Sequence, residues 1–267
     1  MAAILSSVSS GVQMKPLRAV ITGHEGVGKT TLCAGAPDPI FVTTEDGLGL
    51  IDAPTIATDS HAKTNAILDE LISEDHSYRS LVFDAIDGEE PHINEAVVQA
   101  NGTPGQTIGQ IGRGTGYLLV DKAWVELFAK FDALRAARSM NILVISHLKA
   151  DYIEDPVVGT YMKYRPNLTK RAVPLLTKWC DIIGFLAPMQ VVRDEGDAGK
   201  DKTIKVSQNS QQRFLHIHDD GRFIAKNRFG LVDPIEIPQI NGWSALSQAV
   251  AAQFAEAKGT TKKEQAA

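Results

Sequence analysis

The sequence has no apolar run long enough to cross a bilayer, and only two of its 267 residues are cysteine. Cys33 and Cys180 lie far apart, which excludes a disulfide framework and offers no metal-ligand spacing. We expect two buried thiols in a reducing, cytoplasmic protein. Residues 1–14 are expected to form a loose tail, because their serine-rich start lacks the basic region and apolar core of a signal peptide.

The chain also has little excess of charge of one sign, with 27 basic and 32 acidic residues and a net charge of −5. This balance argues against non-specific binding of nucleic acid. One segment departs from it, because residues 160–178 carry five basic side chains and no acidic one. Hydrophobic residues at 43% and charged residues at 22% are typical of a globular protein.

A glycine-rich stretch matches the P-loop spacing G-x-x-x-x-G-K-[ST] without a mismatch. The expected nucleotide-binding residues are Gly23, His24, Glu25, Gly26, Val27, Gly28, Lys29, Thr30 and Thr31. The glycines let the backbone curl so that its N–H groups face a phosphate chain. Lys29 brings a positive charge to the β- and γ-phosphates, and the Thr30 hydroxyl suits Mg²⁺. The sequence therefore predicts a protein that binds a nucleoside triphosphate.

Alternating apolar runs and helical patterns predict an α/β fold with a mainly parallel central sheet flanked by helices. Strands are expected at 17–22, 40–44, 80–83, 141–145 and 181–186, and helices at 61–73, 89–99, 117–139, 170–179 and 244–257. Antiparallel hairpins are expected from strands at 189–193, 203–208, 213–217 and 222–225. Residues 101–116, with six glycines, are expected to form a long flexible loop, and 148–169 an irregular stretch. Residues 15–232 would form one domain, followed by a C-terminal extension at 233–267.

Acidic side chains end two of the expected strands. Asp84 follows Leu81-Val82-Phe83, as a Walker B carboxylate that holds Mg²⁺ with Thr30 would. Glu45 ends the second strand, at the edge where parallel sheets present ligands, and could activate the attacking water. Its neighbour Asp46 is the alternative, and either strand-end acid could instead be a solvated turn residue.

Two further segments could take part in function. His147 ends the fourth strand, where it could sense the γ-phosphate or be merely structural. After it, positive charge and aromatic rings together suit single-stranded nucleic acid. The candidates for DNA binding are Lys149, Tyr161, Lys163, Tyr164, Arg165, Lys170 and Arg171. The alternative interpretation is a solvated loop.

The P-loop, Glu45, Asp84, the Ser146-His147 strand end and the late run Lys226-Asn227-Arg228-Phe229-Gly230 together resemble RecA-like P-loop ATPases. The chain is most similar to compact AAA-type P-loop ATPases of bacteriophages and prophages, which include RecA-like single-strand annealing proteins. The Lys226–Gly230 run is similar to a signature of the RadA branch of that family.

The resemblance implies a RecA-like fold that binds ATP and Mg²⁺, with Glu45 activating water. It also implies that 101–116 and 148–169 face DNA. Lys226 and Arg228 would contact ATP bound by a neighbouring subunit, so that the protein forms a ring or filament. Phage or host replication and recombination proteins would be further partners, and no membrane would be involved.

We therefore expect an ATPase that binds single-stranded DNA and assists recombination, annealing or replication of a phage. The alternative is a nucleotide-dependent regulatory or assembly protein that acts on a protein partner. A small-molecule kinase would need an arginine-rich lid, and no arginine cluster suggests one. A GTPase is disfavoured because the sequence has no Asn-Lys-x-Asp element.

Overall fold

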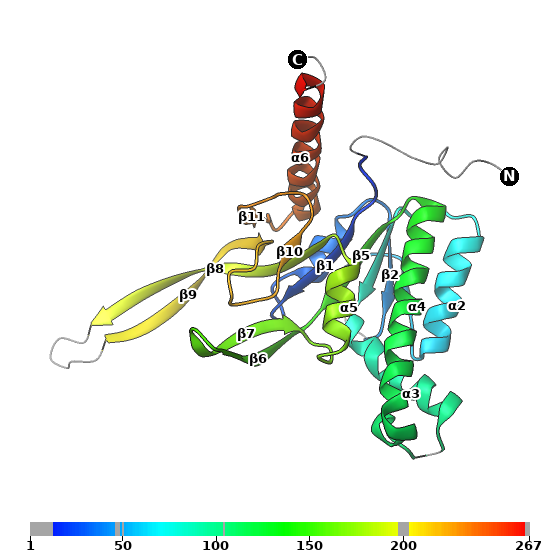
Figure 1. Cartoon of the computed structure of the whole chain (residues 1–267). Helices are drawn as coiled ribbons and strands as arrows, with labels where there is room; N and C mark the ends of the chain where they lie inside the picture. The colour runs from blue at the N-terminus through cyan, green and yellow to red at the C-terminus, as the bar shows by residue number, and fades with distance from the viewer. Residues whose placement is uncertain (1–12, 46–48, 50, 104, 197–202, 265–267) are drawn as a thin grey trace.

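The computed structural model in Figure 1 describes residues 13–45, 49, 51–103, 105–196 and 203–264. The strands are β1 (Arg18–Gly23), β2 (Pro39–Thr43), β3 (Thr55–Ala57), β4 (Ser80–Asp84), β5 (Asn141–Ser146), β6 (Leu148–Asp155), β7 (Gly159–Pro166), β8 (Ile182–Gly196), β9 (Thr203–His216), β10 (Lys226–Asn227) and β11 (Ile235–Glu236). The helices are α1 (Lys29–Ala34), α2 (His61–Ser73), α3 (Ile86–Asn101), α4 (Thr115–Arg138), α5 (Ala172–Trp179) and α6 (Gly242–Glu264), with short 3₁₀ turns η2 (Ile108–Gln110) and η3 (Gly112–Gly114).

The main sheet runs in the order β11-β9-β8-β1-β5-β4-β2-β3, and β10 pairs with β8. Strands β8, β1, β5, β4, β2 and β3 are parallel, whereas β9, β10 and β11 pair antiparallel with their neighbours. The expected fold class, a mainly parallel sheet flanked by helices with later antiparallel strands, is confirmed. Because β5 lies between β1 and β4, the ends of these three strands place Gly23, Ser146 and Asp84 along one edge of the sheet.

Two hydrophobic cores cover the two faces of this sheet, because successive side chains of a strand point to opposite faces. In β1, Val20 packs into the core that contains buried residues of α2, α3, α4 and α5. Its neighbours Ala19 and Ile21 pack into the opposite core, which contains buried residues of α1 and α6. Cys33 and Cys180 are both buried free thiols, as predicted. No helix in the described parts of the chain is long and apolar enough to cross a membrane.

The expectation of an irregular stretch at 148–169 is wrong. Strands β6 and β7 pair antiparallel along their whole length, from Leu148 opposite Pro166 to Asp155 opposite Gly159. The hairpin carries few buried side chains, so its sequence lacks the alternation of apolar and polar residues that marks a half-buried strand. It projects from the body on the same side as the β8–β9 hairpin (Figure 1).

Other differences concern length and local order. The glycine-rich segment 101–116, expected to be a flexible loop, contains η2 and η3 and the start of α4. Met189–Arg193 belongs to β8, which continues to Gly196, and the expected strands at 203–208 and 213–217 fall largely within one strand, β9. Residues 222–225 form an isolated bridge at Phe223 in place of the expected strand. Strand β3 was not predicted, because its three residues are all exposed.

Candidate nucleotide site

The P-loop joins β1 to α1 with the geometry that its sequence predicts. Gly26 and Gly28 have φ of 72° and 93°, a region that side chains with a Cβ rarely adopt. Lys29 begins α1 and is buried, with 6% of its surface exposed. Its ammonium group donates to the carbonyl oxygens of Gly23 at 2.9 Å and His24 at 3.1 Å. The loop therefore holds a cation where the phosphate chain would lie.

Thr30 and Asp84 meet across the site as predicted for Mg²⁺ ligands. The Thr30 hydroxyl donates to a carboxylate oxygen of Asp84 at 3.0 Å, which brings two hard oxygen donors together. Burial raises the pKa of Asp84, against the opposing effects of the Thr30 hydrogen bond and the Lys29 charge. Burial likewise lowers the pKa of Lys29, against the charge of Asp84. A divalent cation fits this donor set, because its charge would favour the ionised carboxylate.

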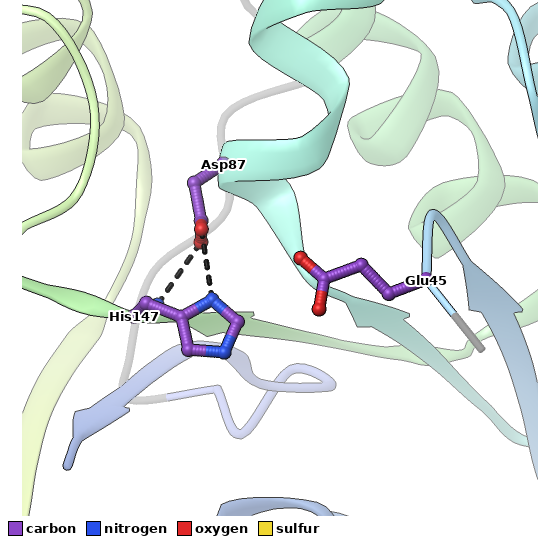
Figure 2. Close-up of side chains that lie close together, drawn as sticks. All are labelled: Glu45, Asp87 and His147. Atoms are coloured by element: carbon purple, nitrogen blue, oxygen red, sulfur yellow. Dashed lines mark hydrogen bonds and ion pairs between the residues drawn. The ribbon is translucent and has the colours of Figure 1, made fainter. Parts of the chain in front are cut away.

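Glu45 and His147 complete the site from the ends of β2 and β5 (Figure 2). A ligand atom from each, together with one from Asp87, lies within 4.8 Å of the others. His147 is held by Asp87 through two contacts: its backbone N–H donates to one carboxylate oxygen at 3.0 Å, and Nδ1 lies 2.8 Å from the other. Asp46, the alternative to Glu45, lies outside the described residues.

One cavity of about 150 Å³ brings together the predicted catalytic residues Lys29, Glu45, Asp84 and His147. Its lining residues are Glu25, Gly26, Lys29, Thr30, Thr43, Glu45, Asp84 and His147. All of these except Thr43 were expected site residues. A larger cavity of about 670 Å³ lies between α3 and the segment at 102–108, and Glu95 is the single charged side chain in its lining. The charged groups that phosphate chemistry would need therefore line the smaller cavity.

Arg213, in β9, is a site residue that the sequence did not reveal. It is buried, and its guanidinium donates to the carbonyl oxygens of Val27 at 2.9 Å and Gly28 at 3.3 Å. It also donates to Ile237 and Pro238. A Cβ added at Gly28 would lie 1.8 Å from a guanidinium nitrogen of Arg213. Neither spacing nor a motif marks Arg213, because its contact with the P-loop depends on the pairing of β8 and β9.

The candidate DNA-binding cations are mostly paired with carboxylates of the same chain. Lys163 lies 2.8 Å from Asp219, and Arg171 is ion-paired with Asp121. Arg165 and Lys170 both pair with Asp151, at 3.0 and 3.4 Å. Lys149 is exposed on β6 and makes no ion pair with another described residue. The aromatic candidates are half-buried; Tyr164 stacks on Phe185, and Tyr161 lies on β7.

The hairpin base contacts the nucleotide site directly. Tyr164 packs edge-on against His24 of the P-loop, with ring centroids 5.3 Å apart. On the other side, the Asn167 amide donates to Asp87 at 3.5 Å, and Thr169 donates its N–H and hydroxyl to Glu90 at 2.9–3.1 Å. The β6–β7 hairpin is thus attached to both the P-loop and α3.

Lys226 and Arg228 lie at the opposite edge of the sheet from the P-loop. Lys226 donates to the carbonyl oxygens of Thr177 and Cys180, at 2.5 and 2.9 Å. Arg228 lies 3.4 Å from Asp181, which precedes β8 and also binds Arg18. These cations therefore do not reach the nucleotide site of their own chain.

The mainly parallel sheet and the loop between β1 and α1 are consistent with the P-loop NTPase fold. The family model for an AAA domain matches residues 15–229, most of the chain, and the protein belongs to this family. Membership of this family implies nucleotide-binding ATPase activity that uses a nucleotide and usually Mg²⁺. No curated protein matches the sequence.

Proposed function

We propose that the protein hydrolyses ATP with the residues that line the smaller cavity. The observation that carries this is the convergence of Lys29, Thr30, Asp84, Glu45 and His147 on one space. Lys29 and the P-loop N–H groups bind the phosphates. Thr30 and Asp84 would hold Mg²⁺, which neutralises charge on the phosphate oxygens.

Glu45 acts as the general base in this reaction. A bond forms between the water oxygen and the γ-phosphorus while the bond from that phosphorus to the bridging oxygen of ADP breaks. The water proton passes to Glu45, and Lys29 offsets the negative charge that develops on the β-phosphate of the leaving ADP. The products are ADP and inorganic phosphate.

In this proposal the β6–β7 hairpin responds to the nucleotide and binds single-stranded DNA. Contacts with His24 and with Asp87 and Glu90 of α3 support a link between the nucleotide and this hairpin. Lys149 and Lys170 are exposed, and Tyr152 presents 70% of its surface to solvent for stacking. In this RecA-like scheme the protein assists recombination, annealing or replication of a phage.

A protein partner is the second candidate, because of the composition of the hairpin. Most of its cations are neutralised internally, whereas Val157, Val158 and Met162 are 88%, 72% and 45% exposed. Val157 and Val158 lie in the turn of the hairpin and Met162 lies midway along β7, and exposed apolar side chains on a projecting element are typical of a protein-binding surface. The protein would then act as a nucleotide-dependent regulatory or assembly factor.

Steady-state ATP hydrolysis with and without single-stranded DNA tests these proposals, with Lys29→Ala as the inactive control. DNA would be supported as the partner if it stimulates hydrolysis by the wild type. That stimulation should be lost in the double variant Lys149→Glu/Lys170→Glu and kept in the double variant Val157→Ser/Val158→Ser. Hydrolysis that is indifferent to DNA, together with no binding in a salt titration, would exclude DNA and favour a protein. A wild type that binds no nucleotide would refute the ATPase itself.

Self-association into a ring or filament is also part of the proposal. Lys226 and Arg228 lie far from their own P-loop, which suits contact with ATP on a neighbouring subunit. Mixing Arg228→Ala with wild type tests this. A shared site predicts loss of activity out of proportion to the added variant, whereas separate sites predict simple dilution.

A further inference from the structure

The side chain of Asp87 makes two contacts with one residue, His147. One carboxylate oxygen accepts from the His147 backbone N–H, and the other faces ring atom Nδ1 at 2.8 Å. The first contact fixes the end of β5, and the second fixes the rotation of the imidazole. Asp87 lies in the first turn of α3, where the helix dipole favours a negative charge.

This geometry sets the tautomer of the ring. A carboxylate can only accept a hydrogen bond, so Nδ1 must carry the proton that joins it to Asp87. In the neutral ring Nε2 then bears a lone pair and no proton. Figure 2 shows Nε2 turned away from Asp87, on the side of Glu45. A neutral His147 held in this way has no N–H to offer to a γ-phosphate oxygen.

The remaining acceptors match the two protons of one water molecule. Glu45 presents a carboxylate, and His147 presents the Nε2 lone pair, in the cavity that also contains Lys29. A water that donates one proton to each acceptor directs an oxygen lone pair away from both, which is the orientation that attack on phosphorus needs.

We propose that Asp87 is a positioning residue that fixes His147 in the Nδ1-protonated tautomer, so that Nε2 accepts a proton of the attacking water beside Glu45. The inference rests on the proposed ATPase function and changes the role of His147 from phosphate sensor to water-orienting group. The proton that is transferred still goes to Glu45, and Nε2 holds the other.

The variant Asp87→Asn separates this role from a structural one. The amide keeps the size of the side chain and can still accept from the His147 backbone, but its NH₂ group donates to Nδ1 and so favours the opposite tautomer. Glu90→Gln is the matched control, because it removes a carboxylate one turn further along α3 without touching His147. Asp87→Glu restores a carboxylate for rescue.

Two measurements test the proposal. Nitrogen-15 NMR of protein labelled at histidine reports the tautomer without nucleotide, and His147→Gln identifies the signal by its loss. We expect an unprotonated Nε2 in wild type and Glu90→Gln, and a protonated Nε2 in Asp87→Asn. We also expect kcat of Asp87→Asn to fall by about 10²-fold with KM for ATP little changed, and to recover in part in Asp87→Glu.

The outcomes distinguish this inference from the proposed function. A protonated Nε2 in the wild type would overturn the inference alone. So would an active wild type together with an Asp87→Asn variant whose kcat lies within about twofold of it. A wild type that hydrolyses no ATP would overturn the ATPase proposal, and the water-orienting role with it.

Discussion

The guanidinium of Arg213 donates to the carbonyl oxygen of Val27 at 2.9 Å, across a separation of 186 positions in the chain. The same side chain binds Gly28, Ile237 and Pro238, so one buried cation joins the P-loop to β9 and to the segment before α6. Burial lowers the pKa of Arg213, and its hydrogen-bond acceptors in the described structure are neutral carbonyls. Among the described residues no carboxylate pairs with this positive charge, which therefore contributes to the potential at the phosphate site.

Replacing Arg213 with methionine should weaken both nucleotide binding and folding. The change leaves several carbonyl oxygens without their donor, and we expect a loss of about 3 kcal/mol in the free energy of unfolding and about tenfold in ATP affinity. Urea titration and isothermal titration calorimetry measure the two effects. Arg222→Met, at an exposed residue paired with Asp220, should change neither. ATP affinity equal to wild type in Arg213→Met would show that the P-loop does not need this anchor.

Gly28→Ala should destabilise the protein more than Gly26→Ala. Both residues have positive φ, so both alanines introduce backbone strain of about 1–2 kcal/mol. At Gly28 the added methyl group also collides with Arg213, whereas nothing lies within 4 Å at Gly26. Thermal melting of the two variants compares the costs. Equal melting temperatures would mean that Arg213 moves aside freely.

Thr30→Ala should raise the Mg²⁺ concentration needed for half-maximal hydrolysis by about tenfold, because it removes one oxygen donor beside Asp84. Thr30→Ser retains the hydroxyl and should behave like wild type. Titration of activity with Mg²⁺ at saturating ATP measures the shift. An unchanged Mg²⁺ requirement in Thr30→Ala would exclude the hydroxyl as a ligand.

Asp181 should make stability depend on pH in the acid range. Burial acts to raise its pKa, but the hydrogen bond from Arg18 and the charges of Arg18 and Arg135 outweigh burial, so the pKa is lowered. A lowered pKa means that the unfolded chain binds the proton more readily. The stabilisation is therefore present above the unfolded pKa of about 3.9 and is lost as pH falls through the lower folded value.

Urea midpoints from about pH 6 to about pH 3 test this linkage. The wild type should lose stability over the lower part of that range, and Asp181→Asn should show a smaller slope from a less stable starting point. Asp75→Asn provides the comparison, because Asp75 is fully exposed and should leave the slope unchanged. A slope in Asp181→Asn equal to that of wild type would assign the acid sensitivity to other carboxylates.

Much of the site could be predicted because its residues end apolar strands. Lys29 and Thr30 follow from a motif, and Asp84, Glu45 and His147 follow from the rule that parallel strands present their carboxyl ends at one edge. The structure places all five in one cavity.

The parts that could not be predicted depend on tertiary contacts. In the sequence, nothing distinguishes Asp87 from an ordinary acidic residue in the first turn of a helix. Its contact with His147 depends on the position of β5 in the sheet. Strands β6 and β7 have few buried side chains, so hydrophobic alternation could not reveal them. The run at 160–178 is basic in sequence, but folding brings Asp151, Asp121 and Asp219 against it. The excess of basic residues in this segment of the sequence therefore did not predict a positively charged surface.

The attachment of the β6–β7 hairpin to α3 has a mechanical consequence. Asp87 holds the residue before β6, and Asp87 and Glu90, one helical turn apart, hold Asn167 and Thr169 after β7. Both legs of the hairpin thus rest on the first two turns of one helix, which begins two residues after Asp84. A tilt of this end of α3 would swing the two strands together as a rigid arm, so that a small displacement beside the phosphates becomes a larger one at the tip.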